Sequence, residues 1–291
     1  MSGINPIGLS VQALQDWLLS QLPARVVALN ATRAAALRSL PGPFVIPSNA
    51  HLTLGADENG TKTEAALTSG GAVTASTLAT DVNNAAVPGV TASVSVDGCL
   101  VLTAQQVPTA TLQSQLVVFE DALADGTHTV GANAALGFSP LGAVVTRLPL
   151  KAPTPGGVVD GWPNQAPDYT QGFWVMIDDR EARPVSDSSL RRDEWLVKLT
   201  LYVMKIEQAQ VKRRTREALN AAMQAVTDVL LTTAGRYLGR QAYGDVLDLE
   251  VMEQTVEGRV IIFDETSNVV HDAGTIVVGL KVFQRPTDVA P

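Results

Sequence analysis

One segment near the C-terminus constrains the fold more than any other part of the sequence. Residues 208–232 carry apolar side chains at a spacing of about 3.6 residues, which predicts a helix that buries one face. The apolar stripe consists of Leu219, Ala222, Met223, Val226, Val229 and Leu230. Burying such a stripe stabilises a fold by roughly 1.5–3 kcal/mol for each large side chain. The helix therefore requires an apolar partner surface.

Strands on both sides of this helix supply the partner surface. Residues 195–206 alternate in polarity and place one apolar face on a predicted strand, formed by Trp195, Val197, Leu199, Leu201 and Val203. Further strands are predicted at residues 173–177, 246–252, 259–263 and 275–283. The sequence therefore predicts an α+β fold in which a small mixed or antiparallel sheet packs on a long helix.

The N-terminal residues are expected to complete the same domain. Residues 10–22 predict an amphipathic helix that Ser10 caps and Pro23 ends, and residues 25–29 predict a strand. Residues 44–150 differ in composition, because they are poor in Lys and Arg and rich in Thr, Ala, Gly and Val. The predicted organisation is a core domain of residues 1–43 and 173–291, an inserted β-rich α+β module at 44–150, and a Pro- and Gly-rich linker or arm at 151–172.

The overall composition argues against several classes of function. The formal net charge of −8 is unlike that of a sequence-specific DNA-binding protein with a basic surface. The single cysteine, Cys99, cannot form an internal disulfide, and we interpret it as a small apolar strand residue. The three histidines are not grouped with other ligands, so no metal site is predicted. No apolar run suggests a membrane span and the first residues do not resemble a signal peptide, so we expect folding in a reducing cytoplasm.

Two charged clusters are candidates for a functional surface. The first lies in a predicted hairpin tip and consists of Asp178, Asp179, Arg180, Glu181, Arg183, Arg191 and Arg192. Adjacent strand residues point to opposite faces, so Asp178 and Asp179 are not expected to share a metal ion. We interpret this cluster as a solvated tip or as intersubunit salt bridges. The second cluster is a basic run in the first turns of the long predicted helix, and it consists of Lys212, Arg213, Arg214 and Arg216. Cations are mildly unfavourable at this end of the helix dipole. We interpret the run as a solvated face or as a contact with an acidic neighbour or with DNA phosphate.

No motif for catalysis or cofactor binding accompanies these clusters. The sequence contains no Gly-x-Ser-x-Gly, Gly-x-Gly-x-x-Gly or P-loop pattern. His271 and Asp272 lie near Asp264 and Glu265, but no nucleophile stands at a readable spacing, so we interpret them as flanking a turn. The sequence predicts a protein that is not an enzyme and that binds no cofactor and no metal.

The order of these elements resembles the tail terminator fold of tailed bacteriophages, which related head–tail joining and neck proteins share. The resemblance covers about half the chain, at its two ends, and includes a final strand that ends Val278-Gly279-Leu280-Lys281-Val282-Phe283. Residues 44–150 stand apart as an insertion. A helix predicted at Thr74–Asn84 with Thr74 as its cap, a hairpin predicted at Val94–Leu102, and the sequence Leu136-Gly137-Phe138, in which Gly137 ends a short helix, are similar to a small module that decorates phage tail and flagellar proteins.

The resemblance implies a structural virion protein that is made in the host cytoplasm. Copies would close into a ring, a hexamer, that terminates the tail tube at the neck and joins it to the head connector, adaptor or portal-side neck protein. The charged tip and the long helix would carry contacts between subunits, the insertion would project outward, and DNA would pass through the lumen. The alternatives are another neck protein, for head completion or as an adaptor, and a carbohydrate-binding or adhesin module in the insertion.

Overall fold

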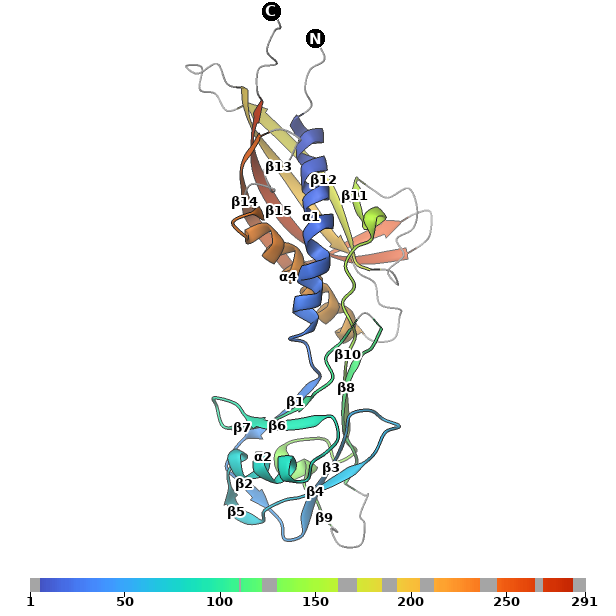
Figure 1. Cartoon of the computed structure of the whole chain (residues 1–291), viewed down its shortest axis with the longest axis vertical. Coiled ribbons are helices and arrows are strands. Elements are labelled where there is room, and N and C mark those ends of the chain that lie inside the picture. Colours follow the sequence, from blue (N-terminus) through green and yellow to red (C-terminus); the bar gives the residue numbers. More distant parts are fainter. Residues whose placement is uncertain are drawn as a thin grey trace, which may run out of the picture. The chain divides into compact units, whose positions relative to one another are not determined.

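The chain folds into two compact units that together form an α+β structure (Figure 1). The sheet unit comprises Met1–Leu29 and Leu150–Pro291, and the inserted unit comprises Asn30–Pro149. The computed structural model describes residues 6–109, 111–121, 130–161, 172–184, 193–204, 212–235, 245–264 and 269–284.

The boundary between the units differs from the predicted one. We expected residues 1–43 to belong with the C-terminal part of the chain. However, strand β1 (Ala36–Pro41) belongs to the inserted unit, because it pairs antiparallel with β7 (Cys99–Ala104). The N-terminal contribution to the sheet unit therefore ends with Leu29.

A five-stranded sheet with the order β11-β12-β13-β15-β14 forms the centre of the sheet unit. The strands are β11 (Val158–Asp160), β12 (Trp174–Pro184), β13 (Asp193–Met204), β14 (Asp245–Asp264) and β15 (Val269–Gln284). β11 is parallel to β12, and the other neighbours are antiparallel. Residues 151–172 were expected to form a linker or an arm packed along the domain or along a neighbour. Part of this stretch does pack along the domain, because a short apolar run joins the sheet as β11 after a 3-10 turn (η1, Pro155–Gly157).

β14 unites two segments that were predicted as separate strands. Residues 246–252 and 259–263 lie on one strand, whose register shifts between Thr255 and Val260. Such an irregularity bends a strand without ending it. The last strand begins at Val269 and not at residue 275 as predicted, so His271 and Asp272, which were expected to flank the turn before it, lie within β15 and pair with Ile262 and Ile261 of β14.

Two helices complete the core of the sheet unit. α1 spans Pro6–Asn30 and α4 spans Lys212–Leu231 (Figure 1). Their apolar residues form one buried cluster with residues of β12, β13 and β15. The predicted stripe of α4 is confirmed, because all of its six members are buried: Leu219, Ala222, Met223, Val226, Val229 and Leu230.

The prediction that Pro23 ends the first helix was wrong. α1 continues through Pro23, residues 25–29 are helical, and Ser10 is a buried helix residue instead of a cap. A proline inside a helix removes one backbone hydrogen bond and costs about 3 kcal/mol. Beyond the proline, Val26 and Leu29 are buried in the core, and each such side chain contributes roughly 1.5–3 kcal/mol. Tertiary packing therefore offsets the cost of the proline.

The inserted unit has its own apolar core. Among its described residues, one sheet has the order β1-β7-β6, a second has the order β10-β8-β3-β4 with β9 beside β3, and β2 pairs with β5. The further elements are β2 (Phe44–Ile46), β3 (Ala50–Gly55), β4 (Thr63–Ala66), β5 (Gly70–Val73), α2 (Ala75–Asn84), β6 (Val90–Val94), β8 (Ser114–Val118), β9 (Val130–Gly131), α3 (Asn133–Leu136) and β10 (Ala143–Arg147). Thr74 caps α2, because its Oγ1 accepts from the Thr77 amide, and Gly137 ends α3 with a φ of 79°.

Candidate assembly surfaces

The charged residues that were predicted as a hairpin tip lie in part on a paired strand. Those on β12 are Asp178, Asp179, Arg180, Glu181 and Arg183. Asp178 lies opposite Thr200 on β13, whereas Glu181 lies opposite Lys198. Three steps along β12 therefore match two steps along β13, which is the signature of a β-bulge at Asp179 and Arg180. The strands extend further than expected because pairing with β13 satisfies the backbone of this polar stretch.

Arg180 has a partner within the chain. Its guanidinium forms an ion pair with Asp160 on β11 and donates to the carbonyl oxygen of Ile177 at 3.3 Å. Asp160 lies opposite Ile177 in the parallel pairing of β11 and β12. The ion pair therefore links Asp160, the last residue of the edge strand β11, to the bulge on β12. This ion pair was not predicted from the sequence, since β11 was not expected.

A groove of about 380 Å³ lies on the sheet where β12, β13 and β15 run side by side. We call it the Gly279 groove, and its lining consists of Glu181, Ala182, Arg183, Leu196, Lys198 and Gly279. The register places Glu181, Lys198 and Gly279 in one row across the three strands. Residues directly opposite one another share a face of the sheet. The row continues onto β14, where Glu250 lies opposite Gly279, so the missing side chain of Gly279 leaves a gap within the row.

The charges of the Gly279 groove lie on the face of the sheet that the two helices do not cover. Lys198 stands between Val197 and Leu199, both of which are buried in the core with α1 and α4. Alternation along a strand places Lys198 on the opposite face. Glu181, Arg183 and Lys198 are all exposed. The uncovered face is thus charged around the groove, whereas further along the strands it carries a small apolar cluster of Met176, Ala273, Val159, Trp174 and Tyr202.

The other predicted candidates fall outside the side chains that the structure describes. Lys212, Arg213, Arg214 and Arg216 occupy the first turns of α4, but only their backbone is described. Arg191 and Arg192 lie outside the described residues altogether. The geometry of the site therefore rests on the part of the first cluster that lies on β12.

A second charged surface lies on the inserted unit, and it was not predicted from the sequence. It surrounds a groove of about 320 Å³, whose lining includes Glu58, Lys62, Phe119, Glu120, Leu141 and Val144. We call these six residues the Leu141 patch. The ammonium of Lys62 lies 4.7 Å from the centroid of the Phe119 ring, within the range of a cation–π interaction.

Leu141 protrudes from this patch on a tight turn. The amide of Gly142 donates to the carbonyl oxygen of Ser139 at 2.9 Å, and the amide of Leu141 donates to Ser139 Oγ at 3.2 Å. Gly142 has a φ of +83°, and a Cβ at this position would lie only 2.5 Å from the carbonyl oxygen of Val118. The turn therefore requires glycine, and it holds Leu141 with 85% of its surface exposed. The sequence Ser139-Pro140-Leu141-Gly142 carries the residue preferences of a type I turn, which is the signal that could have revealed it.

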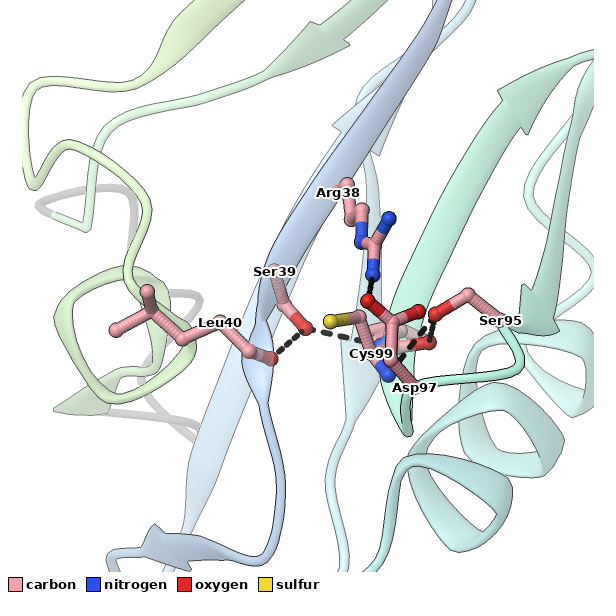
Figure 2. Close-up of polar contacts among 7 residues, drawn as sticks. Arg38, Ser39, Leu40, Ser95, Asp97 and Cys99 are labelled. Atoms are coloured by element: carbon pink, nitrogen blue, oxygen red, sulfur yellow. Dashed lines mark hydrogen bonds and ion pairs between the residues drawn. The ribbon is translucent and has the colours of Figure 1, made fainter.

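A third polar cluster stabilises the turn between β6 and β7 (Figure 2). The amide of Gly98 donates to the carbonyl oxygen of Ser95 at 3.0 Å, and the amide of Cys99 donates to Ser95 Oγ at 3.1 Å. Arg38 on β1 forms an ion pair with Asp97, and its hydrogen bond lowers the pKa of the Asp97 carboxyl below the ordinary value. Hydrogen bonding to Cys99 and then to Asp97 raises the pKa of Arg38. Cys99 is buried on β7, which confirms its interpretation as a strand residue.

The described ranges contain no group of three or more His, Cys, Asp or Glu residues that could hold a metal ion. No helix in the same part of the chain is long and apolar enough to cross a membrane. No protein-family model matches the sequence, and no curated protein is similar enough to it to count as a match. The function of the Gly279 groove and the Leu141 patch must therefore be inferred from their geometry and charge.

Proposed function

We propose that this chain is a structural protein that assembles with copies of itself into a ring at the neck of a tailed bacteriophage. The ring, a hexamer, ends the tail tube and joins the tail to the head connector or to a portal-side neck protein. DNA passes through its lumen without sequence-specific binding. The protein acts without catalysis and without a cofactor.

The difference between the two faces of the five-stranded sheet is the observation that supports this proposal most. The helices α1 and α4 bury one face in an apolar core. The other face exposes Glu181, Arg183 and Lys198 around the Gly279 groove. A ring subunit needs a stable core on one side of its sheet and a surface for a neighbour on the other. Charges of both signs on that surface can fix the register between subunits.

The order of elements gives further support. An N-terminal helix, the antiparallel strands β12 and β13, the long helix α4 and the closing strand β15 follow the order of the tail terminator fold that the sequence resembles. The inserted unit has a separate core and interrupts this order between α1 and β11. The inserted unit is therefore an addition to the series of helices and strands that resembles the tail terminator fold.

Electron microscopy of the purified full chain mixed with phage tail tubes tests the proposal. The proposed function predicts ring-shaped density at one end of each tube, which tubes alone lack. Tubes that stay bare at saturating protein concentration would contradict the terminator role. Rings that bind connector or portal particles but not tubes would favour the alternative role in head completion or as an adaptor.

The inserted unit gives little support to a carbohydrate-binding or adhesin role. Sites for small ligands are lined mainly by apolar and aromatic side chains with a few polar groups. Phe44 and Phe138 are buried in the core of the inserted unit. Phe119 is half-buried and lies beneath the Lys62 ammonium. Its ring is therefore not presented as a bare face for a sugar.

A further inference from the structure

We propose that the inserted unit and the sheet unit are separate cooperative units, so that the inserted unit can unfold while the sheet unit stays folded. This inference concerns the chain itself and does not depend on the ring. It rests first on the composition of the two large cores. Every described member of the core around α1 and α4 comes from Met1–Leu29 or Leu150–Pro291, and every described member of the second core comes from Asn30–Pro149. The stabilisation from apolar burial in each core is therefore gained within one unit.

The two ends of the inserted unit are tied into its own sheets. At the first end, β1 pairs antiparallel with β7, and the amide of Ala104 donates to the carbonyl oxygen of Ala35 at 2.8 Å. At the second end, β10 pairs with β8 over Ala143–Arg147. The backbone groups that form these pairings are satisfied inside the inserted unit.

Ser114 on β8 brings these two ends together. Its buried hydroxyl accepts from the amide of Ala35, just before β1, at 2.8 Å. Its backbone lies opposite Arg147, the last residue of β10. The chain therefore enters and leaves the inserted unit at neighbouring positions, as is usual for domains that tolerate being inserted into another chain.

The sheet unit holds its own two chain ends in the same way. Leu29 ends its first stretch and Leu150 begins its second, and both side chains are buried in the core around α1 and α4. When the inserted unit unfolds, it becomes a long loop between these two residues. The entropic cost of closing a loop rises only with the logarithm of its length, so a long loop is tolerated. The sheet unit can therefore keep its core while the inserted unit is open.

The sequence carries a separate probe for each unit. Trp17 donates from Nε1 to the carbonyl oxygen of Val229 on α4 at 3.4 Å, so its emission reports on the packing of α1 against α4. The single cysteine, Cys99, is buried on β7, so a thiol reagent reaches it when the inserted unit opens. All four tryptophans lie in the sequence ranges of the sheet unit: Trp17, Trp162, Trp174 and Trp195.

Urea denaturation of the full chain with both probes tests the inference. Tryptophan fluorescence follows the sheet unit, and pulses of iodoacetamide at each urea concentration follow Cys99. The matched variants are Leu78→Ala on α2 and Leu201→Ala on β13, which remove fully buried side chains from the two cores. We expect Leu78→Ala to raise the rate of Cys99 labelling at least about tenfold and to leave the urea midpoint of the tryptophan signal unchanged. Leu201→Ala should lower the tryptophan midpoint and leave the rate of Cys99 labelling unchanged.

Each outcome either supports or overturns the separation of the units. A shift of both probes by either variant would overturn it, because the chain would then unfold as one cooperative unit. Leu78→Ala can already expose Cys99 without urea. In that case native tryptophan emission from the variant supports the inference, and the emission of an unfolded chain overturns it. Neither probe measures assembly, so the result leaves the proposed ring to its own test.

Discussion

The guanidinium of Arg25 on α1 donates to the carboxylate of Asp228 on α4, with Nε 3.0 Å from Oδ2. Both side chains are about one-third exposed. Ion pairs that water can reach contribute only about 0.2–1 kcal/mol. Asp228→Asn should therefore lower the free energy of unfolding by at most about 1 kcal/mol, and by less at high salt. Urea denaturation at two salt concentrations measures this change in the free energy of unfolding. A loss of several kcal/mol would show that the pair contributes more than a solvent-exposed ion pair does.

The apolar face of α1 should matter far more than this ion pair. Leu18 is fully buried in the core of the sheet unit, whereas Val27 on the same helix is 71% exposed. Leu18→Ala should lower the free energy of unfolding by about 2–5 kcal/mol, because it removes transfer energy and leaves a cavity. The control variant Val27→Ala should change it by no more than about 0.5 kcal/mol. Similar effects of the two variants in urea denaturation would contradict the assignment of α1 to this core.

The turn at Gly142 should tolerate no side chain. An added Cβ would meet the carbonyl oxygen of Val118, and the positive φ disfavours any other residue. Gly142→Ala should therefore destabilise the inserted unit by more than about 1 kcal/mol. Gly71→Ala is the matched control, since a Cβ at Gly71 would meet no atom within 4 Å. Thermal unfolding compares them, and a neutral Gly142→Ala would refute the turn geometry.

The ion pair of Asp97 and Arg38 predicts a small pH dependence of stability. The hydrogen bond from Arg38 lowers the pKa of Asp97 from its ordinary value of 3.8, so the folded state favours the carboxylate. The resulting stabilisation is present above the ordinary pKa and is lost as the pH falls through the lower value of the folded state. Asp97→Asn should remove this component. Wild-type protein should therefore lose more of its stability than the variant does when the pH falls below about 4.

Thermal unfolding of the two proteins across this acidic range measures the difference. Both side chains of the pair are largely exposed, so the effect should be modest and should shrink as salt is added. A larger loss of stability in Asp97→Asn than in the wild type on acidification would contradict the sign of the shift.

The parts of the fold that followed from the sequence are those with strong local signals. The stripe of α4 recurs at helical spacing, and Thr74 carries a hydroxyl at the position where an N-cap is needed. In both places the residue pattern and the tertiary structure demand the same conformation. The alternation of β13 is a similar case, since Val197, Leu199, Leu201 and Val203 of the predicted apolar face are fully buried.

The parts that did not follow depend on contacts between distant residues. The helix α1 continues past Pro23 because Val26 and Leu29 are buried in the core. The stabilisation from this burial depends on distant residues, so the local sequence around the proline does not predict it. The strand β11 exists because Asp160 and its neighbours meet β12 and Arg180. Likewise, the Leu141 patch gathers residues from three separate segments, so its charges could not be grouped along the sequence.

Native mass spectrometry of the purified full chain measures whether copies of this protein close into a ring. We expect one dominant assembly of fixed size, a hexamer, whose mass does not grow as the protein concentration rises. A chain that remains monomeric at every concentration, even with tail tubes present, would contradict it.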